Sequence, residues 1–264
     1  MRARQLVTRR DRTSWSVSCD SVATLSLSRS EDELEVTATF AAVSSTSRLS
    51  SRFVTSELVL GARGAGDDRI AVLPCASGLV LVVADGSGGM AGASAAAEAL
   101  VAAVRISAEA LAAGALDPAT LLREHDQRSQ AAQGARSKGG QCTAVIAIVR
   151  DSDVSGASVG DSGALQSLNS GDGAVEDLTA AQERKPLIGS GGAAPVAFRG
   201  PLLEGTLLLA TDGLLKYAGW KRLTEALAHP VLDELPAVLL SLVRLPLSLR
   251  HLRAGSRRPR RRRR

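Results

Sequence analysis

The stretch VLVVADGSGGMAGASAAAEAL, from Val80 to Leu100, decides how this chain is interpreted. The apolar run from Gly78 to Gly86 is continuous, which is typical of a strand buried on both faces. The run ends in a carboxylate, Asp85, which is followed by glycines and then by an alanine-rich segment predicted to be a helix. Glycine allows the backbone to bend sharply beside the acid. The stretch therefore predicts a carboxylate presented at the end of a buried strand.

The rest of the chain mixes apolar strands with helices. Helices are expected over Ala91–Leu116 and Pro118–Ala135, and a third helical pattern over 221–245 is broken near Pro230 and Pro236. Strands are expected within 56–74, 139–150 and 205–215, and the segment 156–168 is expected to be the hairpin partner of 139–150. Helices and strands do not alternate strictly. The pattern therefore predicts an α+β fold with antiparallel sheets and helices outside them.

The composition limits the classes of protein that this chain can belong to. With 264 residues, 45% of them hydrophobic and 2% aromatic, the chain can form one large or two small domains with an aliphatic core. The three cysteines and three histidines are scattered, which supports neither a disulfide framework nor a histidine or thiolate metal site. No targeting segment or apolar run long enough to span a membrane is evident, so a cytoplasmic protein is expected.

Three regions differ in composition. Residues 1–52 form a Ser/Thr-rich N-terminal extension, which is either partly strand or weakly ordered. Residues 53–246 hold the strand and helix patterns, and residues 247–264 form an arginine-rich tail. The tail holds nine arginines and no acid, and without those arginines the net charge changes from +5 to −4. A nucleic-acid-binding arm is not favoured, because no aromatic residue for base stacking interrupts the arginines.

Acidic residues recur in glycine-rich turns beside the predicted strands. They are Asp67 and Asp68 in GAGDDRIAV, Asp85 in VVADGSGG, Asp161 in SVGDSGAL and Asp212 in LLATDGLL. Asp-Gly is a common turn dipeptide, so each of these acids taken alone can be a plain turn residue. Unpaired carboxylates beside buried strands are costly unless arginine, lysine or a metal cation neutralises them. Oxygen ligands without histidine or cysteine suit Mg²⁺ or Mn²⁺. A phosphate cradle is not favoured in GSGGMAG, which lacks the lysine of the nucleotide-binding loop.

The order of five motifs resembles that of the protein phosphatase 2C (PPM) family, in particular its bacterial members. The motifs are GARGAGDDR, VADGSGG, GGQCTAVIAIV, ASVGDSGAL and LLLATDGLLKY, and the resemblance extends from Arg63 to Leu215. The stretch LTAAQERKPLIGSG also resembles a loop of the bacterial members. The resemblance implies a four-layer α-β-β-α sandwich of two antiparallel sheets flanked by helices. It also implies hydrolysis of phosphoserine and phosphothreonine in proteins, in a signalling role, by a hydroxide that bridges two Mg²⁺ or Mn²⁺ ions.

The resemblance assigns the metal ligands. Asp85 matches the bridging carboxylate, and Gly86 matches the residue whose carbonyl is a ligand. Asp68 matches a further metal ligand, Asp212 a ligand of one ion, and Asp161 the acid of a third, weaker ion.

The resemblance also assigns a phosphate-binding residue and shows departures from the family pattern. Arg63, five residues before Asp68, matches the arginine that binds the substrate phosphate, a task that suits its planar fork. Asp67 stands where the family has glutamate, and Gly163 stands where the family has arginine, which weakens the assignment of Asp161. The implied partner is a phosphorylated protein, such as the target of a serine/threonine kinase.

Four other residues near these motifs are interpreted as core. Cys142 and Thr143 lie in an apolar strand, where Cys142 is expected to be an inert thiol. Tyr217 and Trp220, after Asp212, are expected to close the edge of the domain.

The C-terminal part departs most from the family. The family closes with a strand that carries a last pair of acidic or amide ligands, whereas Asp233 and Glu234 lie in a helical stretch before Pro236. The shift to arginine after about Pro246 predicts that the native-like final strand is lost, through a frame error or a truncated gene model. One metal ion is then expected to bind weakly, with activity that is low or needs millimolar Mn²⁺. The alternative is a phosphatase-like domain that binds or regulates without turnover.

Overall fold

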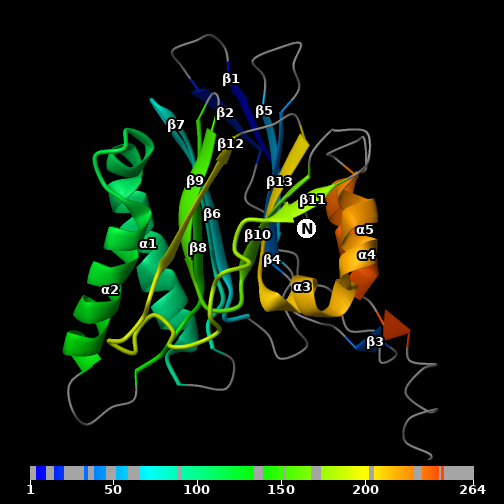
Figure 1. The fold of residues 1–264 in the computed structure, drawn as a ribbon. Helices are drawn as coiled ribbons and strands as arrows, with labels where there is room; N and C mark the ends of the chain where they lie inside the picture. The colour runs from blue at the N-terminus through cyan, green and yellow to red at the C-terminus, as the bar shows by residue number, and fades with distance from the viewer. Residues whose placement is uncertain are drawn as a thin grey trace, which may run out of the picture.

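The computed structural model shows two antiparallel five-stranded sheets that pack face to face and carry helices on their outer faces (Figure 1). The structure describes residues 66–87, 91–133, 139–150, 153–167, 174–201, 205–228 and 234–243, together with the backbone of strands at 4–9, 15–20, 33–34, 39–45, 52–58 and 245–246. The predicted four-layer α-β-β-α sandwich is therefore confirmed. No helix in these ranges is both long and apolar enough to cross a membrane.

The first sheet contains the buried strand that ends at Asp85. Its order is β12 (Val196–Pro201), β9 (Asp153–Val159), β8 (Ala144–Val149), β7 (Gly78–Ala84) and β6 (Arg69–Cys75). Every residue of β7 is buried, as its continuous apolar run predicted, and every residue of β8 is buried as well. These two strands lie next to each other and are covered on both faces, which explains why they lack the polar alternation of a half-exposed strand.

The second sheet includes a strand from the N-terminal region. Its order is β11 (Val175–Asp177), β10 (Gly163–Ser167), β13 (Gly205–Ala210), β4 (Thr39–Ser45) and β5 (Arg52–Leu58). Strands β1 (Arg4–Arg9) and β2 (Trp15–Asp20) form a separate pair, as do β3 (Glu33–Leu34) and β14 (Leu245–Pro246). Because β4 pairs with β13, this sheet extends N-terminal to the domain boundary predicted at residue 53. The tail at 247–264 lies outside the described residues.

In the part of the chain that the structure describes, five helices cover the two sheets. Helices α1 (Ala93–Ala112) and α2 (Pro118–Gln133) lie on the first sheet, and α3 (Asp212–Ala218), α4 (Trp220–Leu227) and α5 (Leu235–Val243) lie on the second (Figure 1). The third helical pattern is thus two helices, α4 and α5. Pro236 stands in the first turn of α5, where its missing N–H is harmless, rather than breaking the helix. Pro230 lies outside the described residues.

The alternation of side chains along each strand divides the core into three layers. In β7, Val80 and Val82 face the helices, whereas Leu81 and Val83 face the other sheet. In β13, Leu207 and Leu209 face the first sheet, and Leu208 faces α3 and α5. Successive side chains of a strand point to opposite faces, so each buried strand contributes to two layers. This arrangement holds the ends of β7 and β13 at a fixed distance across the sandwich.

The predicted hairpin partner of 139–150 corresponds to two strands in different sheets. β9 pairs with β8 in the first sheet, whereas β10 pairs with β13 in the second. The chain changes sheets at Gly160, whose φ of 91° lies in the left-handed region that glycine adopts without strain. The prediction that 156–168 forms one strand was wrong. The polar residues at 160–162 form a turn that separates two apolar strands.

The prediction that Tyr217 and Trp220 are core residues was wrong. Their exposed fractions are 44% and 52%. Helices α3 and α4 instead bury their aliphatic side chains, including Leu214 and Leu223, against the second sheet and α5. Apolar area rather than aromatic character decides which face of a short helix is buried, and here leucine and alanine supply that area.

A truncation in the layer between helices and sheet tests the described packing. Ile146 on β8 is fully buried, so Ile146→Ala should lower the free energy of unfolding by about 3 kcal/mol through lost contacts and a residual cavity. Ile106 on α1 is 88% exposed, and the matched control Ile106→Ala should change stability by less than about 0.5 kcal/mol. Urea unfolding measures both variants, and equal effects would contradict the described packing.

Candidate metal centre

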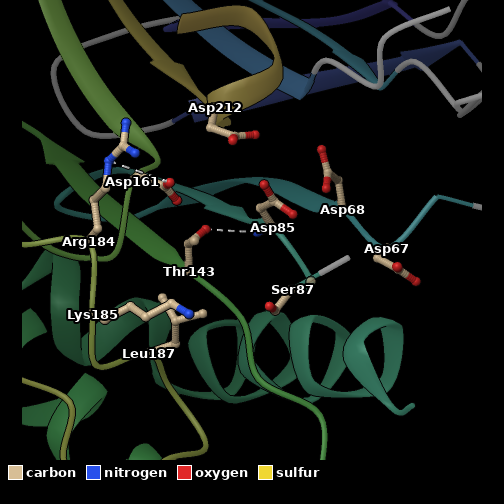
Figure 2. Close-up of a pocket in the computed structure, with 11 residues that line it drawn as sticks. Asp67, Asp68, Asp85, Ser87, Thr143, Asp161, Arg184, Lys185, Leu187 and Asp212 are labelled. Atoms are coloured by element: carbon tan, nitrogen blue, oxygen red, sulfur yellow. Dashed lines mark hydrogen bonds and ion pairs between the residues drawn. The ribbon is translucent and has the colours of Figure 1, made fainter. Parts of the chain in front are cut away.

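One end of the sandwich holds a cavity of about 490 Å³ that is rich in carboxylates (Figure 2). The lining residues are Asp67, Asp68, Asp85, Gly86, Ser87, Thr143, Asp161, Arg184, Lys185, Leu187 and Asp212. All five aspartates that the sequence placed in glycine-rich turns therefore line the same cavity. Arg63, the predicted phosphate-binding residue, lies outside the described residues, so its role stays a prediction.

The aspartates reach the cavity from four separate segments of the chain. Asp68 immediately precedes β6, and Asp85 immediately follows β7. Asp161 lies in the turn at which the chain passes from β9 to β10. Asp212 begins α3 directly after β13. Because strands from both sheets end at this edge, the fold collects acids that are far apart in the sequence.

The crowding of these acids changes their protonation. The pKa of Asp85 is raised to about 9, first of all by burial and then, in decreasing order, by the charge of Asp68, a hydrogen bond with Asp68, and the charges of Asp212 and Asp161. Burial likewise raises the pKa of Asp212, and Asp161 adds to the effect while Lys216 opposes it. Like charges in a partly buried site disfavour ionisation, so a cation bound among these acids would relieve the repulsion.

The donor set fits a hard divalent cation. The acids supply carboxylate oxygens, and the lining includes neither histidine nor cysteine. Cys142 lies nearby, but burial above all, together with the charges of Asp85 and Asp126, raises the pKa of its thiol to about 12. It is therefore a buried neutral thiol, as predicted. No three acidic, histidine or cysteine side chains within the described ranges converge closely enough to form a complete coordination site.

Gly86 stands where the backbone leaves no room for a side chain. A Cβ at this position would lie 2.7 Å from Cβ of Asp67 and 2.8 Å from the backbone carbonyl of Ala93. The Gly86 N–H donates to the Asp67 carbonyl at 3.3 Å. The glycine after Asp85 thus brings the end of β7 against the start of α1 and against the acidic turn before β6.

Two buried hydroxyl groups, which no sequence motif indicated, connect the acid-bearing turns. The Asp85 N–H donates to Oγ1 of Thr143 at 3.1 Å (Figure 2). The same oxygen lies 2.6 Å from Oγ of Ser162 in a hydrogen bond between the two hydroxyl groups. Ser162 follows Asp161 directly, so the pair ties the Asp85 and Asp161 turns together. Thr143 is buried as predicted, but it also lines the cavity. In the sequence, Thr143 stands beside an apolar run, and nothing in that run indicates this contact.

The raised pKa of Asp85 predicts that the stability of the metal-free protein depends on pH. The folded state keeps a proton that the unfolded chain, with its ordinary pKa of 3.8, releases. Stability should therefore fall as the pH rises from about 4 to about 9. Asp85→Asn removes this cost, so in the presence of EDTA its midpoint of thermal unfolding should exceed that of the wild type by about 5 °C at pH 8. The difference should shrink towards pH 5, and a constant or negative difference would contradict the description of this site.

Comparison with known proteins identifies the fold. No family model and no curated protein matches the sequence. Among solved structures, a single-substitution variant of a bacterial serine phosphatase is 22% identical, with a TM-score of 0.60 over 81% of this chain and 92% of that chain. Stp1 from Staphylococcus aureus, a serine/threonine phosphatase, is 20% identical, with a TM-score of 0.59 over 83% and 93%.

A third similar structure contains metal ions. The catalytic domain of the serine/threonine protein phosphatase PstP, solved in complex with two manganese ions, is 18% identical, with a TM-score of 0.56 over 79% of this chain and 92% of that chain. Together with the two packed sheets and their outer helices, these likenesses show that this chain has the fold of the bacterial serine/threonine phosphatases of the protein phosphatase 2C type.

Proposed function

We propose that this chain is a metal-dependent phosphatase that hydrolyses phosphoserine and phosphothreonine in proteins. The observation that carries the proposal is the meeting of five aspartates from four segments in one cavity, at one end of a sandwich shared with serine/threonine phosphatases. The manganese ions in the PstP structure support the same interpretation of the acids. The substrate would be a phosphorylated protein, such as the product of a serine/threonine kinase.

The residues for holding Mn²⁺ or Mg²⁺ are the ones that line the cavity. Asp85 lies among the other acids and would be the central ligand, with Asp68, Asp212 and the carbonyl of Gly86 as further ligands, and Asp161 would hold a weaker third ion. When bound, two such ions supply a water that is deprotonated near neutral pH and positive charge for the phosphoryl oxygens. The acids must then be ionised, so loading at neutral pH displaces the proton that Asp85 holds in the metal-free protein.

Other residues of the chain bind and orient. Arg63 is proposed to pair its guanidinium with two phosphoryl oxygens of the substrate. Arg184 and Lys185 add positive charge at the rim, where the Arg184 side chain is 79% exposed and its Nε lies 4.0 Å from Oδ2 of Asp161. Thr143 fixes the backbone of Asp85 and, through Ser162, that of Asp161. These contacts hold the acid-bearing turns in register before a substrate arrives.

A second candidate function is a phosphatase-like domain that binds a phosphoprotein without turnover. The observation that favours it is the position of the acids after Asp212. Within the part of the chain that the structure describes, neither Glu225 nor Glu234 lines the cavity, and Glu225 pairs with Lys221 on the surface of α4. Asp233 lies outside that part. A site with one ligand fewer would bind its second ion weakly or not at all.

An assay of turnover tests the proposed function. The full chain, supplied with millimolar Mn²⁺, should release phosphate from an aryl phosphate and from a phosphothreonine peptide, and EDTA should stop both reactions. If phosphate is released no faster with the protein and Mn²⁺ than with Mn²⁺ and no protein, the proposal that the chain is a phosphatase is refuted. Binding of the phosphopeptide in the absence of release would favour the second candidate.

A further inference from the structure

A buried carboxylate on α2 holds a loop that borders the cavity. The side chain of Asp126 is 1% exposed. Its Oδ1 accepts hydrogen bonds from the N–H groups of Gly189 at 2.6 Å and Gly191 at 3.0 Å, and its Oδ2 accepts one from Ala193 at 2.9 Å. Hydrogen bonds to an ionised acceptor are stronger than neutral ones. A single side chain thus binds three alternate backbone groups, more than 60 residues away in the sequence.

The loop is shaped to receive this carboxylate. Gly189 and Gly191 have φ angles of 95° and 79°, which turn their N–H groups towards the same point. A Cβ at Gly191 would lie 2.7 Å from Cγ of Gln130, so the loop also packs closely on α2. Converging backbone N–H groups form a site for an anion. Here the chain fills that site with its own acid.

The segment before this loop forms part of the cavity wall. Ile188 and Cys142 exchange two backbone hydrogen bonds, at 3.1 and 3.0 Å, which attach the segment to the chain beside Thr143. Arg184, Lys185 and Leu187 then line the cavity (Figure 2). The ion pair of Arg184 with Asp161 is exposed and long, so it contributes little to holding the rim. The hydrogen bonds of Asp126 to Gly189–Ala193 are buried and charge-assisted, and they anchor the segment next to the cavity edge that Arg184 and Lys185 form.

We propose that Asp126 is a positioning residue: by holding the loop Gly189–Ala193, it keeps Arg184 and Lys185 at the cavity and so sets the affinity for an anionic phosphoryl substrate without contacting that substrate. The link to substrate rests on the proposed function. The link to the loop does not, and it can be tested without catalysis.

Limited digestion with trypsin tests the link to the loop. In Asp126→Asn, an amide group replaces one acceptor oxygen, which leaves at least one loop N–H without an acceptor. The cut between Arg184 and Lys185, identified by mass spectrometry, should then be about tenfold faster or more than in the wild type. The matched control is Glu124→Gln on the same helix, where Glu124 is 59% exposed and pairs with Arg128. The control should be cut at the wild-type rate.

The kinetic arm tests the link to substrate. For a phosphothreonine peptide, Asp126→Asn should raise KM by about three- to tenfold while kcat changes by less than about twofold, because the rim contributes binding rather than chemistry. Accelerated cleavage with an unchanged KM would overturn the role in substrate affinity. A wild type without turnover would refute the proposed function, and the digestion would still decide the role of Asp126 in the loop.

A folded Asp126→Asn variant that trypsin cuts at the wild-type rate would overturn the proposal. If this variant does not fold, hydrogen exchange of the wild-type protein decides instead. The amides of Gly189, Gly191 and Ala193 should then be protected by at least about 10²-fold relative to an unstructured chain. Exchange of these amides at the unprotected rate would overturn the proposal.

Discussion

Asp85→Ala should abolish phosphate release, with a fall in kcat/KM of at least about 10³-fold at saturating Mn²⁺. Asp85 lies among Asp68, Asp161 and Asp212 and is the acid whose protonation depends on all three. Under the proposed function, its loss removes the carboxylate that both ions would share, so we expect that added metal restores little activity. Initial rates with an aryl phosphate, at several Mn²⁺ concentrations, measure the effect.

The control for this variant is Asp117→Asn. Asp117 is also an aspartate, but its Oδ2 accepts hydrogen bonds from Thr120 at the start of α2, outside the carboxylate cavity. The control should keep the wild-type rate within about twofold. An Asp85→Ala protein that is folded and retains more than about a tenth of the wild-type activity would refute the assignment of this cavity as the active site.

Asp212→Asn should lower the rate by about 10²-fold at micromolar Mn²⁺, and millimolar Mn²⁺ should restore part of it. Asp212 enters the cavity from the start of α3, on the side of the second sheet, so we expect it to serve one ion rather than both. Weakened binding, unlike a lost catalytic group, is overcome by a higher concentration of metal. Rates measured across a Mn²⁺ titration separate these two effects.

Glu225→Gln provides the comparison for Asp212→Asn, since Glu225 is a surface acid on the neighbouring helix α4. Its Mn²⁺ dependence should match the wild type. An unchanged Mn²⁺ dependence in Asp212→Asn itself would show that this carboxylate is not a ligand.

The layered fold could be predicted because its signals are local. The apolar run that forms β7 shows directly that the strand is buried on both faces, and glycines beside Asp85 and Asp212 mark where strands end. The passage of the chain between the sheets at Gly160 could not be predicted, because a turn within a hairpin and a crossing between sheets have similar sequences. The exposure of Trp220 depends on which face of α4 meets α5, which the sequence of α4 alone does not specify.

The acids of the site could be predicted, but their supports could not. The five aspartates share a local setting, an acid beside glycine at the edge of a strand, and they follow the order of a known family. Thr143 accepts a hydrogen bond from a residue 58 positions away, and Asp126 accepts hydrogen bonds from residues 63 to 67 positions away. Neither has a local feature that distinguishes it from a core threonine or a surface aspartate. Such contacts arise only when distant segments meet in the folded chain.

The stoichiometry of Mn²⁺ binding tests the central claim most directly. Equilibrium dialysis of the full chain over micromolar to millimolar Mn²⁺, followed by metal analysis, should give two ions per wild-type chain, the second bound more weakly than the first. The Asp85→Ala protein should bind at most one. A wild-type chain that binds no Mn²⁺ at millimolar concentration, or that binds the same number of ions as Asp85→Ala, would contradict the account of this cavity as a binuclear metal centre.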